Sequence, residues 1–304
     1  MATAIIDGIS TRYEVQGSGP PLLMYAPGGF NAVVETWSTQ GVYAKIKLLD
    51  HLPEKYTCIM FDRRECGQSG GRIERVTWTH YVAQGKGLLD HLGIARAHLM
   101  GGCMGCSPVA AFAAAYPQAT LSMVLYWPVG GAKYRISGHQ RFAEHLAFVQ
   151  QHGLDAVVAL VGKDGKTFGA DPRGGPWAAV IKADPAFAAA YARQDTNTYK
   201  LIVAGMARTM FDRDTAPGAE PEDLLRLDIP ALVIPGQDAA RVLGLQILPL
   251  NASTANSIET AFAILIEQQA SALLVGSDPL LTTARPSRSE SGFPKDSEGA
   301  SLTH

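Results

Sequence analysis

The chain has 304 residues, 47% of them hydrophobic and 18% charged, which is sufficient for a large buried core. A formal net charge of −2, with acids and bases mixed along the chain, argues against a nucleic-acid-binding face or a cationic membrane-binding stripe. The N-terminus has no secretory signal pattern, and no apolar stretch reaches the roughly 18 residues that a spanning helix needs. We therefore expect a cytoplasmic, bacterial protein with a small-molecule partner, as a monomer or homodimer.

The four cysteines do not form a recognisable metal or disulfide framework. Cys103 and Cys106 are spaced as C-x-x-C, but no second C-x-x-C or histidine pair follows to complete a zinc site. Thioredoxin-like redox sites share this spacing, although here it lies inside a glycine-rich turn with a better explanation. We expect no metal ion, no organic cofactor and no disulfide framework.

Short apolar runs bounded by turn residues recur along the first half of the chain, each with the length of a buried strand. The runs are 21–26, 58–61, 97–100 and 122–127. Helical patterns follow the second and third runs, at 81–92 and 107–116. This alternation predicts right-handed crossovers and an α/β fold with a mostly parallel, doubly wound sheet.

The second half has a different pattern. Residues 129–228 are helical and rich in Ala, Gln and His, and an apolar run at 229–235 then restores a buried strand. This arrangement is typical of a helical cap inserted in a sheet. The remaining predicted elements are a strand at 245–250, a helix at 257–269 and a strand at 272–276.

The predicted organisation is a core in two parts, 1–128 and 229–281, with the cap, 129–228, between them. Residues 282–304 are polar and rich in Ser, Pro and charge. They are too poor in apolar side chains to order themselves, so we expect a disordered tail.

Residues 101–105, Gly-Gly-Cys-Met-Gly, follow a predicted strand and open a small-residue helix. This is the G-x-nucleophile-x-G pattern, in which the central residue lies on a strained turn and its neighbours must lack bulk. Cys103 stands where serine is usual, and the helix dipole favours its thiolate form. The Met104 backbone N–H would face the oxygen of an attacked carbonyl. The plainer alternative is a small apolar cysteine in a glycine turn.

With this turn, the chain up to about Asp238 resembles the α/β-hydrolase superfamily, and its cysteine is similar to that of thiol-bearing members such as dienelactone hydrolases. The resemblance implies an α/β-hydrolase fold and attack by Cys103 on an ester or lactone. Residues 27–30, Pro-Gly-Gly-Phe, match the family's glycine loop, with Pro27 in place of the usual histidine. In that loop Gly29 or Phe30 would donate the second oxyanion hydrogen bond.

Residues 61–69, FDRRECGQS, resemble the family's D-x-R-G-x-G-x-S turn, with Glu65 where glycine is common. Asp62 and Ser69 are expected to bond local backbone groups and hold this loop beside the pocket. A catalytic role for Glu65 or Cys66 is the weaker interpretation.

Asp238 stands where the family carries its catalytic acid, so the resemblance gives it the role of orienting a histidine. The alternative is an aspartate that caps the next helix. The histidine should follow the acid, but of the eight histidines only the terminal His304 does so. The expected general base is absent.

This absence coincides with a change of resemblance, because residues from about 240 to 285 resemble part of a bacterial ABC-transporter substrate-binding protein. We therefore suspect a chimaeric or frameshifted chain, in which the grafted strand and helix could still fill the last positions of the sheet. The cap histidines, His139, His145 and His152, are expected to be packed or solvated. One of them near Cys103 could nevertheless replace the lost base.

Two functions from different classes remain open. The first is a hydrolase of carboxylic esters or lactones, small bacterial lactones such as acyl-homoserine lactones included, in which Cys103 attacks and Asp238 orients whatever base exists. The second is a catalytically impaired pseudoenzyme or small-molecule-binding protein that keeps the pocket. A periplasmic-type ligand-binding role, borrowed from the C-terminal segment, is weaker because no signal peptide and no remainder of that fold is present.

Overall fold

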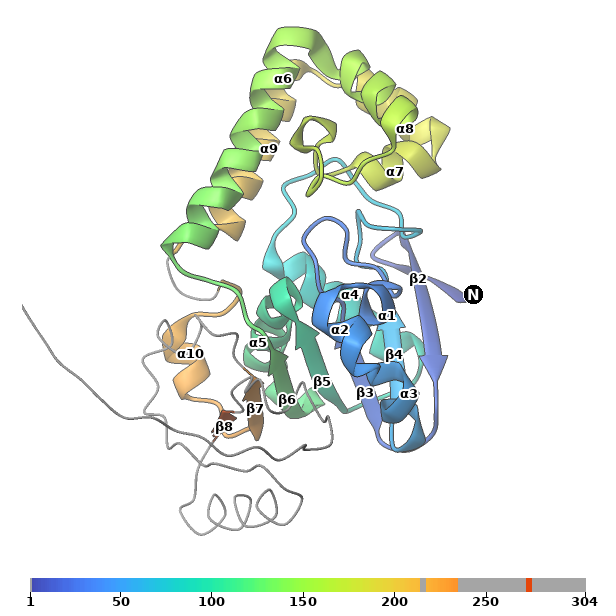
Figure 1. The fold of residues 1–304 in the computed structure, drawn as a ribbon, viewed down its shortest axis with the longest axis vertical. Helices are drawn as coiled ribbons and strands as arrows, with labels where there is room; N and C mark the ends of the chain where they lie inside the picture. Colours follow the sequence, from blue (N-terminus) through green and yellow to red (C-terminus); the bar gives the residue numbers. More distant parts are fainter. Residues whose placement is uncertain (1, 214–216, 235–271, 275–304) are drawn as a thin grey trace, which may run out of the picture.

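The computed structural model of the protein describes residues 2–213, 217–234 and 272–274. Its described strands form one sheet in the order β1-β2-β4-β3-β5-β6-β7-β8 (Figure 1). The strands are β1 (Ala2–Ile6), β2 (Ile9–Gln16), β3 (Pro21–Tyr25), β4 (Thr57–Phe61), β5 (Ala97–Gly102), β6 (Thr120–Tyr126), β7 (Ala231–Ile234) and β8 (Ala272–Leu274). β2 pairs antiparallel with β1 and β4, whereas every pairing from β4 onward to β8 is parallel. The predicted mostly parallel sheet is confirmed.

Helices cover both faces of this sheet, as a doubly wound fold requires. Successive strand residues point to opposite faces, so Leu23 and Tyr25 pack in one apolar cluster with α4 and α5. Leu22 and Met24 pack in the other cluster, with Trp37 of α1. These helices and their neighbours are α1 (Thr36–Thr39), α2 (Gly41–Ile46), α3 (Leu48–His51), α4 (Trp78–His91) and α5 (Cys106–Ala115).

The predicted strands and helices of the first half are confirmed to within a few residues at each end. The largest shift is at the start of α4, predicted at residue 81 and observed at Trp78. Thr77 and His80 explain it, because they form a capping box in which the Thr77 N–H donates to His80 Nδ1 at 3.0 Å. This histidine therefore stabilises a helix end.

The β1–β2 hairpin was not predicted. Its turn is Asp7-Gly8, and both residues have positive φ, 50° and 70°, as a type I′ turn requires. Ile6 pairs with Ile9 across it. An Asp-Gly pair between two alternating runs is a strong hairpin signal, so the sequence did contain the information.

Between Val129 and Leu227 the described residues form helices and turns, and none forms a strand. The helices are α6 (Ala132–Asp164), α7 (Ala178–Ala183), α8 (Pro185–Ala192), α9 (Thr196–Met210) and α10 (Pro221–Leu225). α6 and α9 pack side by side, and with α7 and α8 they lie above the sheet in Figure 1. α6 is two helices that meet at Gly153, whose φ of 79° is not helical.

A buried histidine lies at the centre of the cap. The Arg173 carbonyl can only accept, so His145 Nδ1 donates to it at 2.9 Å and His145 Nε2 accepts from the Tyr199 hydroxyl at 2.6 Å. The Tyr199 oxygen in turn lies 2.5 Å from the Tyr191 hydroxyl. Burial lowers the pKa of His145 to about 4. The imidazole is therefore neutral near pH 7 and organises the packing of α6, α8 and α9.

The last described strand comes from the C-terminal part of the chain. β8 pairs in parallel with β7, with Ala231 opposite Ala272. The predicted strand 272–276 is thus confirmed over Ala272–Leu274. The predicted strand 245–250, the helix 257–269 and the tail 282–304 lie outside the described residues.

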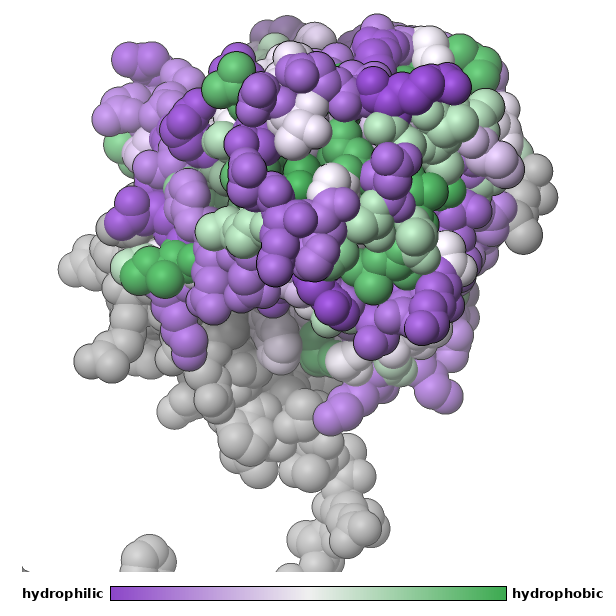
Figure 2. Space-filling model, turned by 90° about the horizontal axis from the view of Figure 1, so that it is seen from above, coloured by the Kyte–Doolittle hydropathy of each residue, from purple (hydrophilic) through white to green (hydrophobic). Residues whose placement is uncertain are grey.

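The face at the cap end is mixed in character. Hydrophilic side chains cover most of it, and apolar side chains emerge between them in smaller groups (Figure 2). Among the described helices, none is both long enough and apolar enough to cross a bilayer.

Two glycines of the cap give a matched test of the packing around His145. Gly175 (φ 74°, ψ 175°) and Gly153 (φ 79°, ψ 174°) share a conformation that other residues rarely adopt. A Cβ at Gly175 would lie 2.4 Å from His145 Cε1, whereas a Cβ at Gly153 would meet nothing within 4 Å. In both alanine variants, backbone strain should lower the free energy of unfolding by about 1–3 kcal/mol. Overpacking against His145 should lower the free energy of unfolding of Gly175→Ala by about 1–3 kcal/mol more. Urea denaturation measures both values. Equal losses of unfolding free energy in the two variants would contradict this account of the cap.

Candidate active site

Cys103 lies at the sharp turn between β5 and α5. Its φ of 52° is in the left-handed region, which non-glycine residues rarely adopt. The residues two before and two after it have no room for a side chain. A Cβ at Gly101 would lie 2.4 Å from the Gly105 oxygen, and a Cβ at Gly105 would lie 2.3 Å from the Tyr25 oxygen. The predicted strained strand-to-helix turn is therefore present, held by backbone packing against the end of β3.

Cys103 differs from the other cysteines in exposure. It is partly exposed, whereas Cys58, Cys66 and Cys106 are buried. Burial raises the pKa of Cys58 to about 11, of Cys66 to about 12, and of Cys106 well above its usual value. These three stay protonated near neutral pH, and Cys106 donates to the Gly101 carbonyl at 3.1 Å. The burial of Cys66 argues against a nucleophilic role for this residue.

The glycine loop 27–30 follows β3 directly and lies against the turn. A Cβ at Gly29 would sit 3.5 Å from the Met104 sulfur, so the loop and the residue after the cysteine are neighbours. The Phe30 ring turns to the cap and contacts the rings of Phe142 and Phe168, with centroids 5.9 and 5.4 Å away. The structure thus brings Gly29 and Met104 together beneath an aromatic group of the cap.

Two tyrosines that the sequence did not single out also lie near Cys103. A Cβ at Gly102 would meet the Tyr43 ring and hydroxyl at 3.0 Å. Burial first, and then the electrostatic interaction with Cys103, raise the pKa of Tyr43 and of Tyr134 above the ordinary value. The Tyr134 hydroxyl, at the start of α6, is buried and has no hydrogen-bond partner among the described residues. Both phenols stay protonated and can donate, but neither can act as a base near neutral pH.

The loop after β4 is held as predicted. Asp62 accepts hydrogen bonds from the backbone N–H groups of Val34 and Gln68 at 2.9 and 2.8 Å. The Ser69 hydroxyl donates to the Asp62 carbonyl at 2.8 Å. These bonds tie the loop to the segment before α1, and the structural interpretation of Asp62 and Ser69 is confirmed.

Glu65 takes the left-handed conformation that glycine usually supplies here, with φ of 66°. Its carboxylate is fully buried and bonds Arg64 at 3.0 Å. Burial raises the pKa of Glu65 to about 7, opposed by the Arg64 charge. The side chain is thus held in a structural contact with Arg64.

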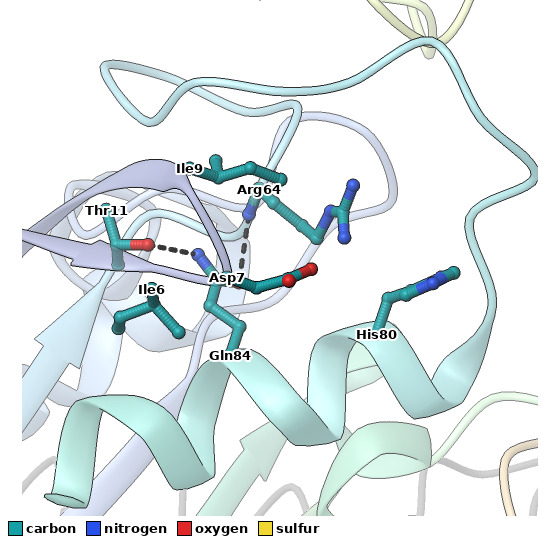
Figure 3. Close-up of a pocket in the computed structure, with 7 residues that line it drawn as sticks. All are labelled: Ile6, Asp7, Ile9, Thr11, Arg64, His80 and Gln84. Atoms are coloured by element: carbon teal, nitrogen blue, oxygen red, sulfur yellow. Dashed lines mark hydrogen bonds between the residues drawn. The ribbon is translucent and has the colours of Figure 1, made fainter.

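A small cavity opens beside this ion pair (Figure 3). Its volume is about 10 Å³, which holds no more than one water molecule. The lining residues are Ile6, Asp7, Ile9, Thr11, Arg64, His80 and Gln84. Gln84 already bonds the Thr11 hydroxyl and the Arg64 N–H, the contacts dashed in Figure 3. It is a structural cavity, separate from the Cys103 turn.

The cap histidines have other partners. Both ring nitrogens of His145 are bonded within the cap, and His139 Nε2 lies 2.9 Å from the Phe211 carbonyl. His152 is exposed and packs on Phe148. None of these contacts includes Cys103. Asp238 and His304, the predicted acid and the only histidine after it, lie outside the described residues.

Among the described residues, no three His, Cys, Asp or Glu side chains lie close enough together to hold a metal ion. The sequence also gave no role to Arg63, the third residue of the FDRRECGQS turn. A charged residue only two positions after a buried strand was the signal that could have drawn attention to it.

Comparisons with known proteins agree with this architecture. A family model described as alpha/beta hydrolase fold matches residues 21–128. A solved α/β hydrolase enzyme from a Medee basin deep-sea metagenome library superposes with a TM-score of 0.51 at 18% identity, over 90% of this chain and 88% of that one. The enol-lactonase of Burkholderia xenovorans LB400 aligns with a TM-score of 0.48 at 20% identity, over 91% of each chain. The chain has an α/β-hydrolase fold.

A curated relative matches part of the chain. The dihydrolipoyllysine-residue acetyltransferase component of the acetoin cleaving system of Cupriavidus necator is 32% identical over 127 residues. The match covers 42% of this chain and 32% of the relative. This chain therefore spans about a third of the length of that relative.

The exposure of the cysteines predicts how the native thiols react. With dithionitrobenzoate near pH 8, Cys103 should react rapidly, and Cys58, Cys66 and Cys106 should react only on unfolding, because they are buried and protonated. The measurement is the stoichiometry of the fast absorbance phase. Cys103→Ala should remove that phase, and a fast phase that persists in this variant would show that another thiol is exposed.

Proposed function

We propose that the protein is a thiol-dependent hydrolase of carboxylic esters or lactones. The observation that carries the proposal is the left-handed backbone of Cys103, with its side chain partly exposed on a turn fixed by glycine packing. Such a conformation costs about 1–3 kcal/mol and is retained where a side chain must project from the end of a strand. A cysteine that only filled space would not need it.

The chemistry has two steps. The Cys103 thiolate adds to the substrate carbonyl, so that a carbon–sulfur bond forms and the carbonyl electron pair moves onto oxygen. When the carbonyl re-forms, the alkoxide leaves and takes a proton from water, and a thioester remains. Water then adds to the thioester, the thiolate leaves and the acid is released. The Met104 N–H, with that of Gly29 or Phe30, would stabilise the oxyanion in both steps.

The surroundings of the turn favour a substrate with an apolar acyl group. Phe30, Phe142 and Phe168 pack edge to face where the cap meets the glycine loop. The buried, unpartnered Tyr134 hydroxyl supplies one polar group close to Cys103. A mainly apolar site with few polar groups suits a small ester or lactone.

The general base decides the rates of the two steps. Among the described residues, none of the histidine contacts includes Cys103, so these residues give the proposed acyl-enzyme no imidazole to activate water, and deacylation should be slower than acylation. Asp238 would orient a base if one reaches the site, and a chimaeric origin of residues 240–285 would explain why the usual histidine is missing.

The same contacts favour a second candidate, a pseudoenzyme or small-molecule-binding protein that keeps the fold. His145, which is neutral and buried, is fixed by two hydrogen bonds and is not available to Cys103. This candidate predicts ligand binding without acyl transfer.

Rapid kinetics with p-nitrophenyl acetate separate the two candidates. The proposed hydrolase should release about one equivalent of nitrophenolate per chain in a burst, followed by slow turnover. Cys103→Ala should show neither phase. Cys103→Ser should acylate far more slowly, since a hydroxyl needs a base that the described site does not supply. Equal turnover in wild type and Cys103→Ala, with both proteins folded, would refute the proposed function.

A further inference from the structure

Arg63 is a buried arginine that the proposed chemistry has not yet used. It lies two residues after the end of β4, and no part of it is exposed. Its Nη2 donates to the carbonyl oxygen of Gly28 at 2.6 Å and also to the carbonyl oxygen of Gly29. One guanidinium nitrogen thus holds two consecutive peptide units of the glycine loop.

The direction of those carbonyls fixes the direction of two N–H groups. In a trans peptide unit the C=O and N–H bonds point in opposite directions. The Gly28 carbonyl shares its unit with the Gly29 N–H, and the Gly29 carbonyl shares its unit with the Phe30 N–H. Both N–H groups therefore point away from Arg63. They are the two candidates for the second oxyanion donor.

The loop cannot hold this arrangement by itself. Gly28 has a φ of 106°, and glycine adopts positive and negative φ about equally readily. The conformational freedom of Gly28 allows this backbone conformation but does not favour it over others. A second, weaker contact comes from the Cys66 thiol, which lies 3.8 Å from the Gly29 oxygen. Arg63 is the strong anchor.

The electrostatics of Arg63 are unlike those of the other buried arginines. Arg12 lies 3.2 Å from Asp62, and Arg64 lies 3.0 Å from Glu65. Among the described residues Arg63 has no carboxylate partner; its guanidinium lies 4.7 Å from the Tyr81 ring, and Nε and Nη1 are buried without a partner. Burying an uncompensated charge costs several kcal/mol. The position of Arg63 beside the glycine loop gives this buried charge a role, which is to bond the loop carbonyls.

We propose that Arg63 is the positioning residue of the oxyanion hole: it holds the Gly28 and Gly29 carbonyls so that the Gly29 and Phe30 N–H groups face the acyl oxygen. The proposal rests on the proposed function, because the oxyanion forms only when Cys103 adds to a carbonyl. Arg63 touches neither the substrate nor the sulfur in this role.

The test compares two reactions of the same thiol. Acylation by p-nitrophenyl acetate passes through an oxyanion, whereas alkylation by iodoacetamide does not. Arg63→Lys keeps the charge but has one donor centre in place of a planar fork. Its acylation rate should fall about 10- to 100-fold, while its alkylation rate stays within about twofold of wild type. Equal losses in both reactions would mean that the turn itself is damaged, and would overturn the proposal, as would no loss in either.

Two further variants serve as controls, one for folding and one for specificity. Arg63→Met removes a buried charge that has no carboxylate partner among the described residues, so the change leaves no opposite charge uncompensated. It should therefore fold, as checked by its melting curve, and still lose acylation selectively; normal acylation in a folded Arg63→Met would overturn the proposal. Arg12→Lys matches Arg63→Lys, but at a buried arginine that is paired with a carboxylate. It should leave the ratio of the acylation rate to the alkylation rate unchanged. An equal fall in that ratio would show that the effect is not specific to Arg63.

The two claims fail in different ways. If Cys103→Ala hydrolyses the ester like wild type, the proposed function is wrong. If Cys103 is required but both Arg63 variants acylate normally, only the role of Arg63 is wrong.

Discussion

The close backbone contact between the end of β3 and the turn after β5 is the constraint on which the site depends. A methyl group at Gly105 would meet the Tyr25 carbonyl at 2.3 Å, so this position tolerates no side chain. Beside this contact the chain at Cys103 has a positive φ, and its side chain lies at the end of the sheet. Because residues 27–30 begin only two positions after the end of β3, the same contact brings the glycine loop beside Met104. Cys103 and the candidate oxyanion donors are therefore placed together by one piece of backbone packing.

The buried charged and neutral polar groups have distinct tasks. Arg12 and Arg64 form ion pairs with buried carboxylates that hold the loop after β4. Arg63 instead uses its charge on two peptide carbonyls of the glycine loop. His145 is neutral because burial lowers its pKa to about 4, and it organises the cap. Among the described residues, these buried groups are thus committed to structural contacts.

The sequence predicted the parts of the fold that depend on local pattern. Apolar runs located the parallel strands, and Gly101 to Gly105 located the strained turn at Cys103, because periodicity and small-residue spacing are visible in one chain. The β1–β2 hairpin was missed although Asp7-Gly8 is a turn signal. The anchoring role of Arg63 could not be read, since it depends on a carbonyl pair more than thirty residues away in sequence. Nor did spacing show that His145 is neutral and fully bonded, because its partners come from other segments of the cap.

Mass spectrometry of the acyl-enzyme tests the central claim most directly. The protein is mixed with p-nitrophenyl acetate, quenched in acid during the burst, and digested for peptide mapping. A nucleophilic Cys103 predicts one acetyl group per chain, on the peptide that carries this cysteine and on its sulfur, with Cys58, Cys66 and Cys106 unmodified in their peptides. Ester consumption with Cys103 unmodified at every quench time, or with the acetyl group on another residue, would contradict the claim.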